Sequence, residues 1–194
     1  MEGSLSEHST ILWRRLDMPG HEVAELTATT AGFRLSGVAA FAYENMPCRM
    51  EYVIRCDALW RTKSLHLQGH VGATLASLDL ARSTGDAWIA NDTPMPHLLG
   101  CVDVDLGFSP STNLLPIRRL RLAVGAHASV RAAWVRFPEL KLEVLEQTYT
   151  HREDLAYAYE SAGGDFRRNL STNASGFVVD YPDYWVAEAF VAHA

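Results

Sequence analysis

The chain has 194 residues, of which 48% are hydrophobic and 21% are charged. This length and composition suffice to bury one sizeable core, so we expect a single domain over residues 1–194, with residues 1–10 forming a flexible N-terminus. The 17 basic and 23 acidic residues give a formal net charge of −6, which repels phosphate backbones and argues against general nucleic-acid binding.

Neither the cysteines nor the N-terminus indicates export. Cys48, Cys56 and Cys101 are odd in number and lack C-x-x-C spacing, so we expect small buried side chains rather than disulfides or a zinc site. The N-terminus is acidic where a signal peptide is basic, and no early cysteine is placed to accept a lipid. No apolar run approaches the roughly 20 residues that cross a bilayer. We therefore expect no transmembrane segment and a cytoplasmic location.

The first half of the chain alternates apolar and polar residues, which is typical of half-buried β-strands. Residues 21–28 place Glu22, Ala24 and Leu26 on one strand face. Similar patterns occur in residues 50–57, 62–69 and 73–83, with glycines at 69, 72 and 85 near the turns. Each of these segments is predicted to be a strand.

The stretch "CVDVDLGFSPSTNLLPIRRLRL", residues 101–122, is predicted to contain a hairpin. Residues 101–108 alternate acids with aliphatic side chains, and residues 118–125 alternate arginines with Leu120, Leu122 and Val124. The intervening S-P-S-T-N sequence is rich in residues that favour turns. Two strands flanking a polar turn are the expected result.

The C-terminal part of the chain continues the strand pattern. Residues 130–161 are predicted to form three strands, with Pro138 ending the first and a bulge or a fully buried stretch at Val144 and Leu145. Residues 176–185 are predicted to form a last strand that stops at Pro182, and residues 186–194 a short terminal helix.

About ten strands with regular turn signals predict an all-β fold. The expected architecture is a single curved antiparallel sheet that forms a β-roll or half-barrel around an apolar cavity, with little helix. A curved sheet of this size often encloses more space than its own side chains fill, which leaves room for a ligand.

Asp103 and Asp105 lie two apart on one predicted strand face and are candidates for chemistry. Mutual repulsion could raise the pKa of one of them, or the pair could bind a hard cation. The favoured alternative is a solvated strand face, because a metal needs more oxygen ligands and a paired-carboxylate hydrolase needs a second carboxylate across a cleft.

Asn113, Arg118 and Arg119 follow in the same stretch. Asn113 is typical of a turn, and the arginines could hold a carboxylate, phosphate or sulfate by paired hydrogen bonds. Salt bridges to the two aspartates across the hairpin are the slightly favoured alternative.

Sequence motifs for cofactors and metals are lacking. The eight histidines show no H-E-x-x-H or H-x-H spacing, and neither G-x-G-x-x-G, a P-loop nor G-x-S-x-G occurs. We therefore expect no metal and no cofactor. Aromatic rings of the kind that line sugar and lipid pockets are plentiful, although most are expected in the core: Trp13, Trp60, Trp88, Trp134, Trp185, Tyr149, Tyr157, Tyr159, Tyr181 and Tyr184.

Several of these motifs occur in the order seen in one known family. "LW" at 59–60, "GDAW" at 85–88, the long block "LLGCVDVDLGFSPSTNLLPIRRL" and "GFVVDYP" at 176–182 resemble the bacterial family described as putative glycolipid-binding, formerly a domain of unknown function. The resemblance covers the chain from about Trp13 to Tyr184. One departure is Leu114, where the family form "TNTLPIRR" has threonine.

The resemblance implies a β-roll similar to periplasmic lipoprotein carriers, which shield acyl chains in an apolar cavity. Since this sequence shows neither an export signal nor a lipidation cysteine, shuttling through the periplasm is not expected. The leading hypothesis is a non-enzymatic protein that holds a lipid or glycolipid. The expected ligand-binding residues are Asp103, Asp105, Asn113, Arg118, Arg119, Tyr149 and Tyr157.

Two alternatives stay open at this point. The first is a hydrolase or isomerase-like enzyme that acts on a small lipid or sugar with Asp103 or Asp105 as general base. The second is a structural or interaction protein without a ligand. The sequence leaves the oligomeric state undetermined.

Overall fold

A computed structural model describes residues 8–193. Residues 1–7 of the expected flexible N-terminus lie outside the described residues, and residues 8–10 belong to the first strand. The elements are β1 (His8–Arg15), β2 (Gly20–Thr29), β3 (Gly32–Tyr43), β4 (Met46–Cys56), β5 (Thr62–Val71), β6 (Thr74–Arg82), β7 (Trp88–Ala90), β8 (Thr93–Pro94), η1 (Pro96–Leu98), β9 (Asp103–Leu106), η2 (Ser111–Asn113), α1 (Leu114–Leu120), β10 (His127–Arg136), β11 (Lys141–Glu153), β12 (Ala156–Ser161), η3 (Ala162–Gly164), β13 (Phe166–Thr172), β14 (Val178–Tyr181) and β15 (Trp185–His193).

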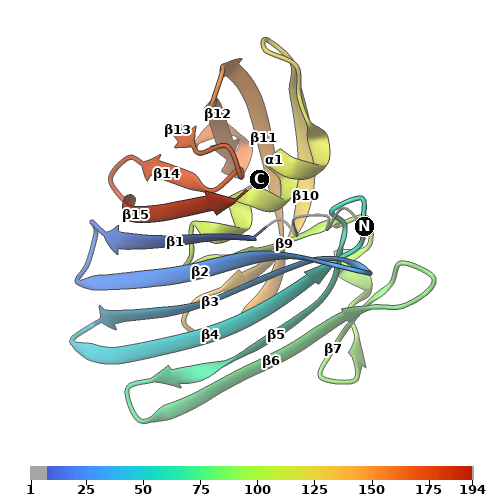
Figure 1. The fold of residues 1–194 in the computed structure, drawn as a ribbon. Coiled ribbons are helices and arrows are strands. Elements are labelled where there is room, and N and C mark those ends of the chain that lie inside the picture. The colour runs from blue at the N-terminus through green and yellow to red at the C-terminus, as the bar shows by residue number, and fades with distance from the viewer. Residues whose placement is uncertain (1–7, 194) are drawn as a thin grey trace, which may run out of the picture.

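All the strands belong to one sheet of 15 strands, ordered β8-β7-β6-β5-β4-β3-β2-β1-β15-β14-β13-β12-β11-β10-β9. The first and last strands, β1 and β15, pair with each other, so an N-terminal half, β1–β8, and a C-terminal half, β9–β15, form a continuous surface. Figure 1 shows this sheet curling around its concave side without closing. The predicted all-β fold with a single curved sheet and little helix is confirmed.

The two ends of the sheet approach each other across the interior. The Thr62 backbone N–H donates to the Val102 carbonyl at 3.3 Å, and the Val104 N–H donates to Thr62 Oγ1 at 3.3 Å. Trp88 Nε1 donates to the Cys101 carbonyl at 3.1 Å. These bonds hold the segment leading into β9 against β5 and β7, while the sheet stays open.

The interior of the N-terminal half is filled with side chains. One face of each strand over residues 21–28 and 50–57 is buried, as a half-buried strand requires, and the tryptophans Trp13, Trp60 and Trp88 are at most 1% exposed. All three cysteines are buried and free, as expected. The core of this half is therefore packed, and a hollow of about 500 Å³ lies outside it, between β4–β6 and residues 138–140.

The predicted hairpin at residues 101–125 is wrong. β9 pairs in parallel with β10, and residues 114–120 form helix α1 instead of part of a second strand. Two parallel neighbours need a crossover connection, which α1 supplies. The helix buries its first four residues, Leu114 to Ile117, and Arg121 follows its last residue as a left-handed C-cap with φ 44°.

Two further predictions need correction. Residues 186–194 were expected to be helical, but Trp185–His193 is strand β15, because it fills the place between β14 and β1 in the sheet. Val144 and Leu145 form no bulge, because they pair in regular register with Ala133 and Ala132. They are also only partly buried, so the stretch is not fully buried either. Among the described residues, no helix is long and apolar enough to span a membrane.

Candidate functional site

The S-P-S-T-N segment, residues 109–113, is a buried turn inside the curved sheet; we call it the SPSTN turn. Thr112 Oγ1 accepts the Leu106 N–H at 3.2 Å, and Asn113 Nδ2 donates to the Pro110 carbonyl at 3.2 Å. Asn113 Oδ1 accepts the Tyr149 hydroxyl at 2.8 Å. Buried polar groups need such partners, and these bonds tie the turn to β11 in the C-terminal half.

On its other side the SPSTN turn contacts Glu22 of β2, which is 1% exposed. Glu22 Oε1 lies 2.6 Å from the Tyr52 hydroxyl and 2.5 Å from Ser109 Oγ. Ser111 Oγ lies 2.7 Å from both the Tyr52 hydroxyl and Ser109 Oγ. The four oxygens therefore form a closed ring of hydrogen-bonding contacts, which we call the Glu22 ring. It joins β2 and β4 to the SPSTN turn.

Counting protons shows which form of Glu22 completes the ring. The ring has four oxygen–oxygen contacts, and the three hydroxyls of Tyr52, Ser109 and Ser111 supply only three protons. An ionised Glu22 leaves one contact without a hydrogen. A proton on Glu22 Oε1 supplies the fourth, so each oxygen donates once and accepts once around the ring.

The electrostatic environment of Glu22 also favours its protonated form. Burial raises the pKa of Glu22 from 4.5 to about 7, and hydrogen bonds from Ser109 and Tyr52 and the charge of Arg15 only partly oppose it. Glu22 Oε2 is buried with no hydrogen-bond partner among the described residues, a deficit that is smaller for a neutral carboxyl than for a carboxylate. The sequence did carry a signal, because Glu22 shares the apolar face of residues 21–28.

A pocket of about 370 Å³ lies between the SPSTN turn and strands of the C-terminal half. Its walls include six aromatic rings: Trp134, Tyr159, Phe166, Tyr181, Tyr184 and Trp185. Neighbouring rings contact each other, with centroids 6.0 Å apart for Tyr159 and Phe166 and 5.5 Å apart for Tyr181 and Tyr184. We call this the aromatic pocket; its volume is near the lower end of the roughly 300–1,000 Å³ of small-molecule sites.

Asp105 supplies a carboxylate to the aromatic pocket. Gln147 Nε2 donates to Asp105 Oδ2 at 2.9 Å and lies 3.0 Å from the Tyr159 hydroxyl, so Gln147 holds both groups in place. Burial raises the pKa of Asp105 to about 6, the Gln147 hydrogen bond opposes this shift, and the charge of Asp103 adds to it. Within the described residues Asp105 Oδ1 makes no hydrogen bond, so it is available as an acceptor.

Arg15 forms another part of the wall. Its guanidinium donates to both oxygens of Asp17, at 2.7 Å and 3.1 Å, and lies 5.1 Å from the centre of the Trp185 ring. Ser109 of the Glu22 ring and Asn113 of the SPSTN turn also line the pocket. Polar groups therefore lie next to aromatic rings in the wall, as Arg15 does beside Trp185 and Asp105 beside Trp134.

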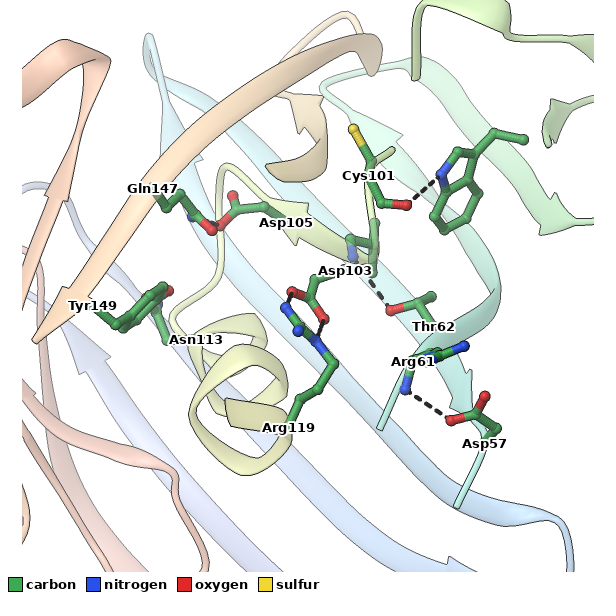
Figure 2. Close-up of polar contacts among 12 residues, drawn as sticks. Asp57, Arg61, Thr62, Cys101, Asp103, Asp105, Asn113, Arg119, Gln147 and Tyr149 are labelled. Carbon is green, nitrogen blue, oxygen red and sulfur yellow. Dashed lines mark hydrogen bonds and ion pairs between the residues drawn. The ribbon is translucent and has the colours of Figure 1, made fainter. Parts of the chain in front are cut away.

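The predicted site residues separate into groups, several of which are visible in Figure 2. Asp105 and Asn113 line the aromatic pocket, with Tyr149 hydrogen-bonded behind Asn113. Asp103 instead forms an ion pair with Arg119, whose Nε donates to Oδ1 at 3.0 Å and whose Nη2 donates to Oδ2 at 2.5 Å. Asp103 is 1% exposed, so the solvated strand face expected for it is wrong.

The salt bridge expected for Asp103 is confirmed for Arg119, but it joins β9 to α1 rather than two strands of a hairpin. Burial raises the pKa of Asp103, and the Arg119 hydrogen bond opposes that shift. Arg118 lies over the Trp60 ring at 4.7 Å, and Tyr157 stacks on His151 at 4.6 Å. Neither Arg118 nor Tyr157 is among the residues that line the aromatic pocket.

Residues missed as site candidates come from distant parts of the chain. Arg15, Ser109 and Phe166 line the pocket, and Tyr159, which was named among the aromatic rings but not among the expected ligand-binding residues, does so too. Composition indicated that some aromatic rings would line a pocket. Which rings do so depends on the strand order, which the sequence pattern does not contain.

The fold and the pocket together define a class: an open β-roll with an aromatic, partly polar pocket on its concave side. Comparison with known protein families identifies one family. The family described as "Putative glycolipid-binding" matches residues 10–187, and the chain belongs to this family.

A solved structure supports the same grouping. The chain is similar to a DUF1089 family protein from Pseudomonas aeruginosa, with a TM-score of 0.74 and 29% sequence identity over 83% of this chain and 89% of that one. None of the curated proteins compared with the chain matches it.

Proposed function

We propose that the aromatic pocket binds the sugar-like headgroup of an amphiphile. The observation that carries the proposal is the position of Asp105, a carboxylate with one free oxygen among six aromatic rings. Sugar rings present apolar C–H faces, which pack on aromatic rings, and hydroxyls, which donate to carboxylates. Asn113 and Ser161 add polar groups at the same pocket.

The size of the pocket supports a headgroup rather than a whole lipid. A volume of about 370 Å³ suits a small ring-shaped group, and the core of the N-terminal half is packed, with Trp13, Trp60 and Trp88 at most 1% exposed. The alkyl part of the ligand then extends out of the pocket. The family name, which speaks of glycolipid binding, agrees with a ligand of this chemistry.

Hydrolysis by paired carboxylates has weaker support. Asp105 is the single carboxylate among the described residues that line the pocket. Glu22 is sealed behind Ser109, with which it shares a 2.5 Å contact, and Asp103 is held in the ion pair with Arg119. Because two-carboxylate hydrolysis needs both groups at the scissile bond, binding is the better-supported activity.

Tryptophan fluorescence tests this proposal, because Trp134 and Trp185 lie in the pocket wall. An alkyl glycoside and the alkanol of equal chain length are titrated below their micelle concentrations. We expect saturable quenching by the glycoside only, weakened about tenfold in Asp105→Asn, which loses one charge-assisted hydrogen bond. Asp79→Asn, which changes an exposed aspartate on β6, is the matched control. Equal responses to the glycoside and the alkanol, or no saturable response, would refute the proposal.

A further inference from the structure

A second hollow, of about 410 Å³, lies beside β12 and β13. Ala158 pairs with Asn169 and Glu160 pairs with Arg167, so these four residues share a sheet face. Tyr159 pairs with Arg168, and these two residues start from the opposite face because successive strand residues alternate, although both also border the hollow. The hollow is lined by Arg152, Ala158, Tyr159, Glu160, Arg167, Arg168, Asn169 and Pro182.

Charge distinguishes this hollow from the rest of the molecule. Arg152, Arg167, Arg168 and Glu160 belong to its lining, and Asp183 is ion-paired with Arg168, which leaves a local excess of one positive charge on a chain whose formal net charge is −6. Ala158 adds only a methyl group, so the cationic side chains surround open space rather than packed atoms.

Much of the hydrogen-bonding capacity in the hollow is unused. The side chains of Arg152 and Asn169 make no ion pair or hydrogen bond within residues 8–193. Arg167 Nε lies 3.7 Å from Glu160 Oε2, which is a loose and exposed ion pair. These groups are therefore available to an incoming ligand.

Arg168 is the fixed member of the set. Its Nη2 lies 3.2 Å from Asp183 Oδ2, its Nη1 donates to the Arg167 carbonyl at 2.7 Å, and its guanidinium lies 4.7 Å from the Phe166 ring. Phe166 also lines the aromatic pocket, so Arg168 borders both spaces. An arginine held by several contacts, beside an exposed arginine without a partner among the described residues, is suited to an anion with several acceptor oxygens.

We propose that the hollow formed by Arg152, Arg167 and Asn169 next to Arg168 is a binding site for a phosphate or phosphomonoester group. A planar guanidinium donates two parallel hydrogen bonds to such oxyanions, and the Asn169 amide adds a neutral donor. This site is separate from the sugar-like headgroup proposed for the aromatic pocket, and it stands whether or not that proposal holds.

The test is a titration with inorganic phosphate, followed by amide and arginine side-chain NMR at constant ionic strength set with sodium chloride. We expect saturable shifts confined to β11–β13, with the affinity reduced at least about tenfold in Arg152→Gln/Arg167→Gln. Arg55→Gln, an exposed arginine on β4, is the matched control and should bind phosphate as the unmodified protein does. Unfolding curves of all variants check that the fold is kept.

Vesicles distinguish the source of the phosphate. Binding to vesicles that contain phosphatidic acid, but not to pure phosphatidylcholine, with release by inorganic phosphate, identifies a lipid headgroup. Saturable phosphate binding without vesicle binding identifies a small soluble phosphate compound. The proposal is overturned if chloride produces the same shifts, if the double variant and Arg55→Gln behave alike, or if the shifts spread over the whole surface.

Discussion

Replacing Glu22 by glutamine should make the folded protein more stable above neutral pH. The pKa of Glu22 is about 7 in the fold against an ordinary 4.5, so the folded protein retains a proton that the unfolded chain releases between these two values. This proton stabilises the fold fully below pH 4.5, and the contribution is lost as the pH rises to about 7. At about 1.4 kcal/mol for each pH unit between the two pKa values, the loss is about 3 kcal/mol.

Glutamine remains neutral at every pH and can donate two hydrogen bonds from its amide. Glu22→Gln should therefore exceed the unmodified protein in unfolding free energy by up to about 3 kcal/mol at pH 8, with the difference shrinking toward pH 4.5. Urea unfolding at half-unit pH steps measures this difference. Asp103 and Asp105 also have raised pKa values, but their effects are common to both proteins and cancel in the comparison.

Glu146→Gln serves as the matched control, because Glu146 is 79% exposed on β11. Its pH dependence should follow that of the unmodified protein. If Glu22→Gln kept the full decline in stability between pH 4.5 and 7, the proton would not reside on Glu22 and the four-oxygen ring would be wrongly assigned.

Two other substitutions test the supports of the site. At Gly37 an added Cβ would lie 2.4 Å from the Tyr52 hydroxyl. Gly37→Ala should therefore displace that hydroxyl from Glu22 and lower the unfolding free energy, measured in urea, by about 1–3 kcal/mol. An unchanged midpoint of urea unfolding would contradict this close fit. Arg119→Ala leaves the buried Asp103 without its partner, so it should lower the unfolding free energy by about 3–5 kcal/mol near neutral pH. A loss below about 1 kcal/mol would show that water replaces the guanidinium.

The regular strands were predictable because the alternation of apolar and polar residues is a local pattern of neighbouring positions. Ala24 and Leu26, or Ile54 and Cys56, reveal their face within a few positions of the chain. The family block that contains the SPSTN turn was also recognisable. Residues 186–193 show the limit of local information, because their place between β14 and β1 decided their conformation.

The strand predicted within residues 114–122 was wrong for a related reason. Its apolar residues fit both a strand and a short helix face, and the parallel pairing of β9 with β10 selected the helix. The site was predictable only in part. Asp105 and Asn113 come from the conspicuous polar block, whereas Arg15 and Tyr159 reach the same pocket through pairings between distant strands.

The most direct test of the headgroup proposal is a crystal structure of the protein with an alkyl glycoside. The sugar ring should lie in the aromatic pocket against Tyr159 or Tyr181, with a hydroxyl within hydrogen-bond distance of Asp105 Oδ1 and the alkyl chain leaving the pocket. A pocket that holds only water while the glycoside binds elsewhere, or an alkyl chain buried where the sugar is expected, would contradict the proposed function.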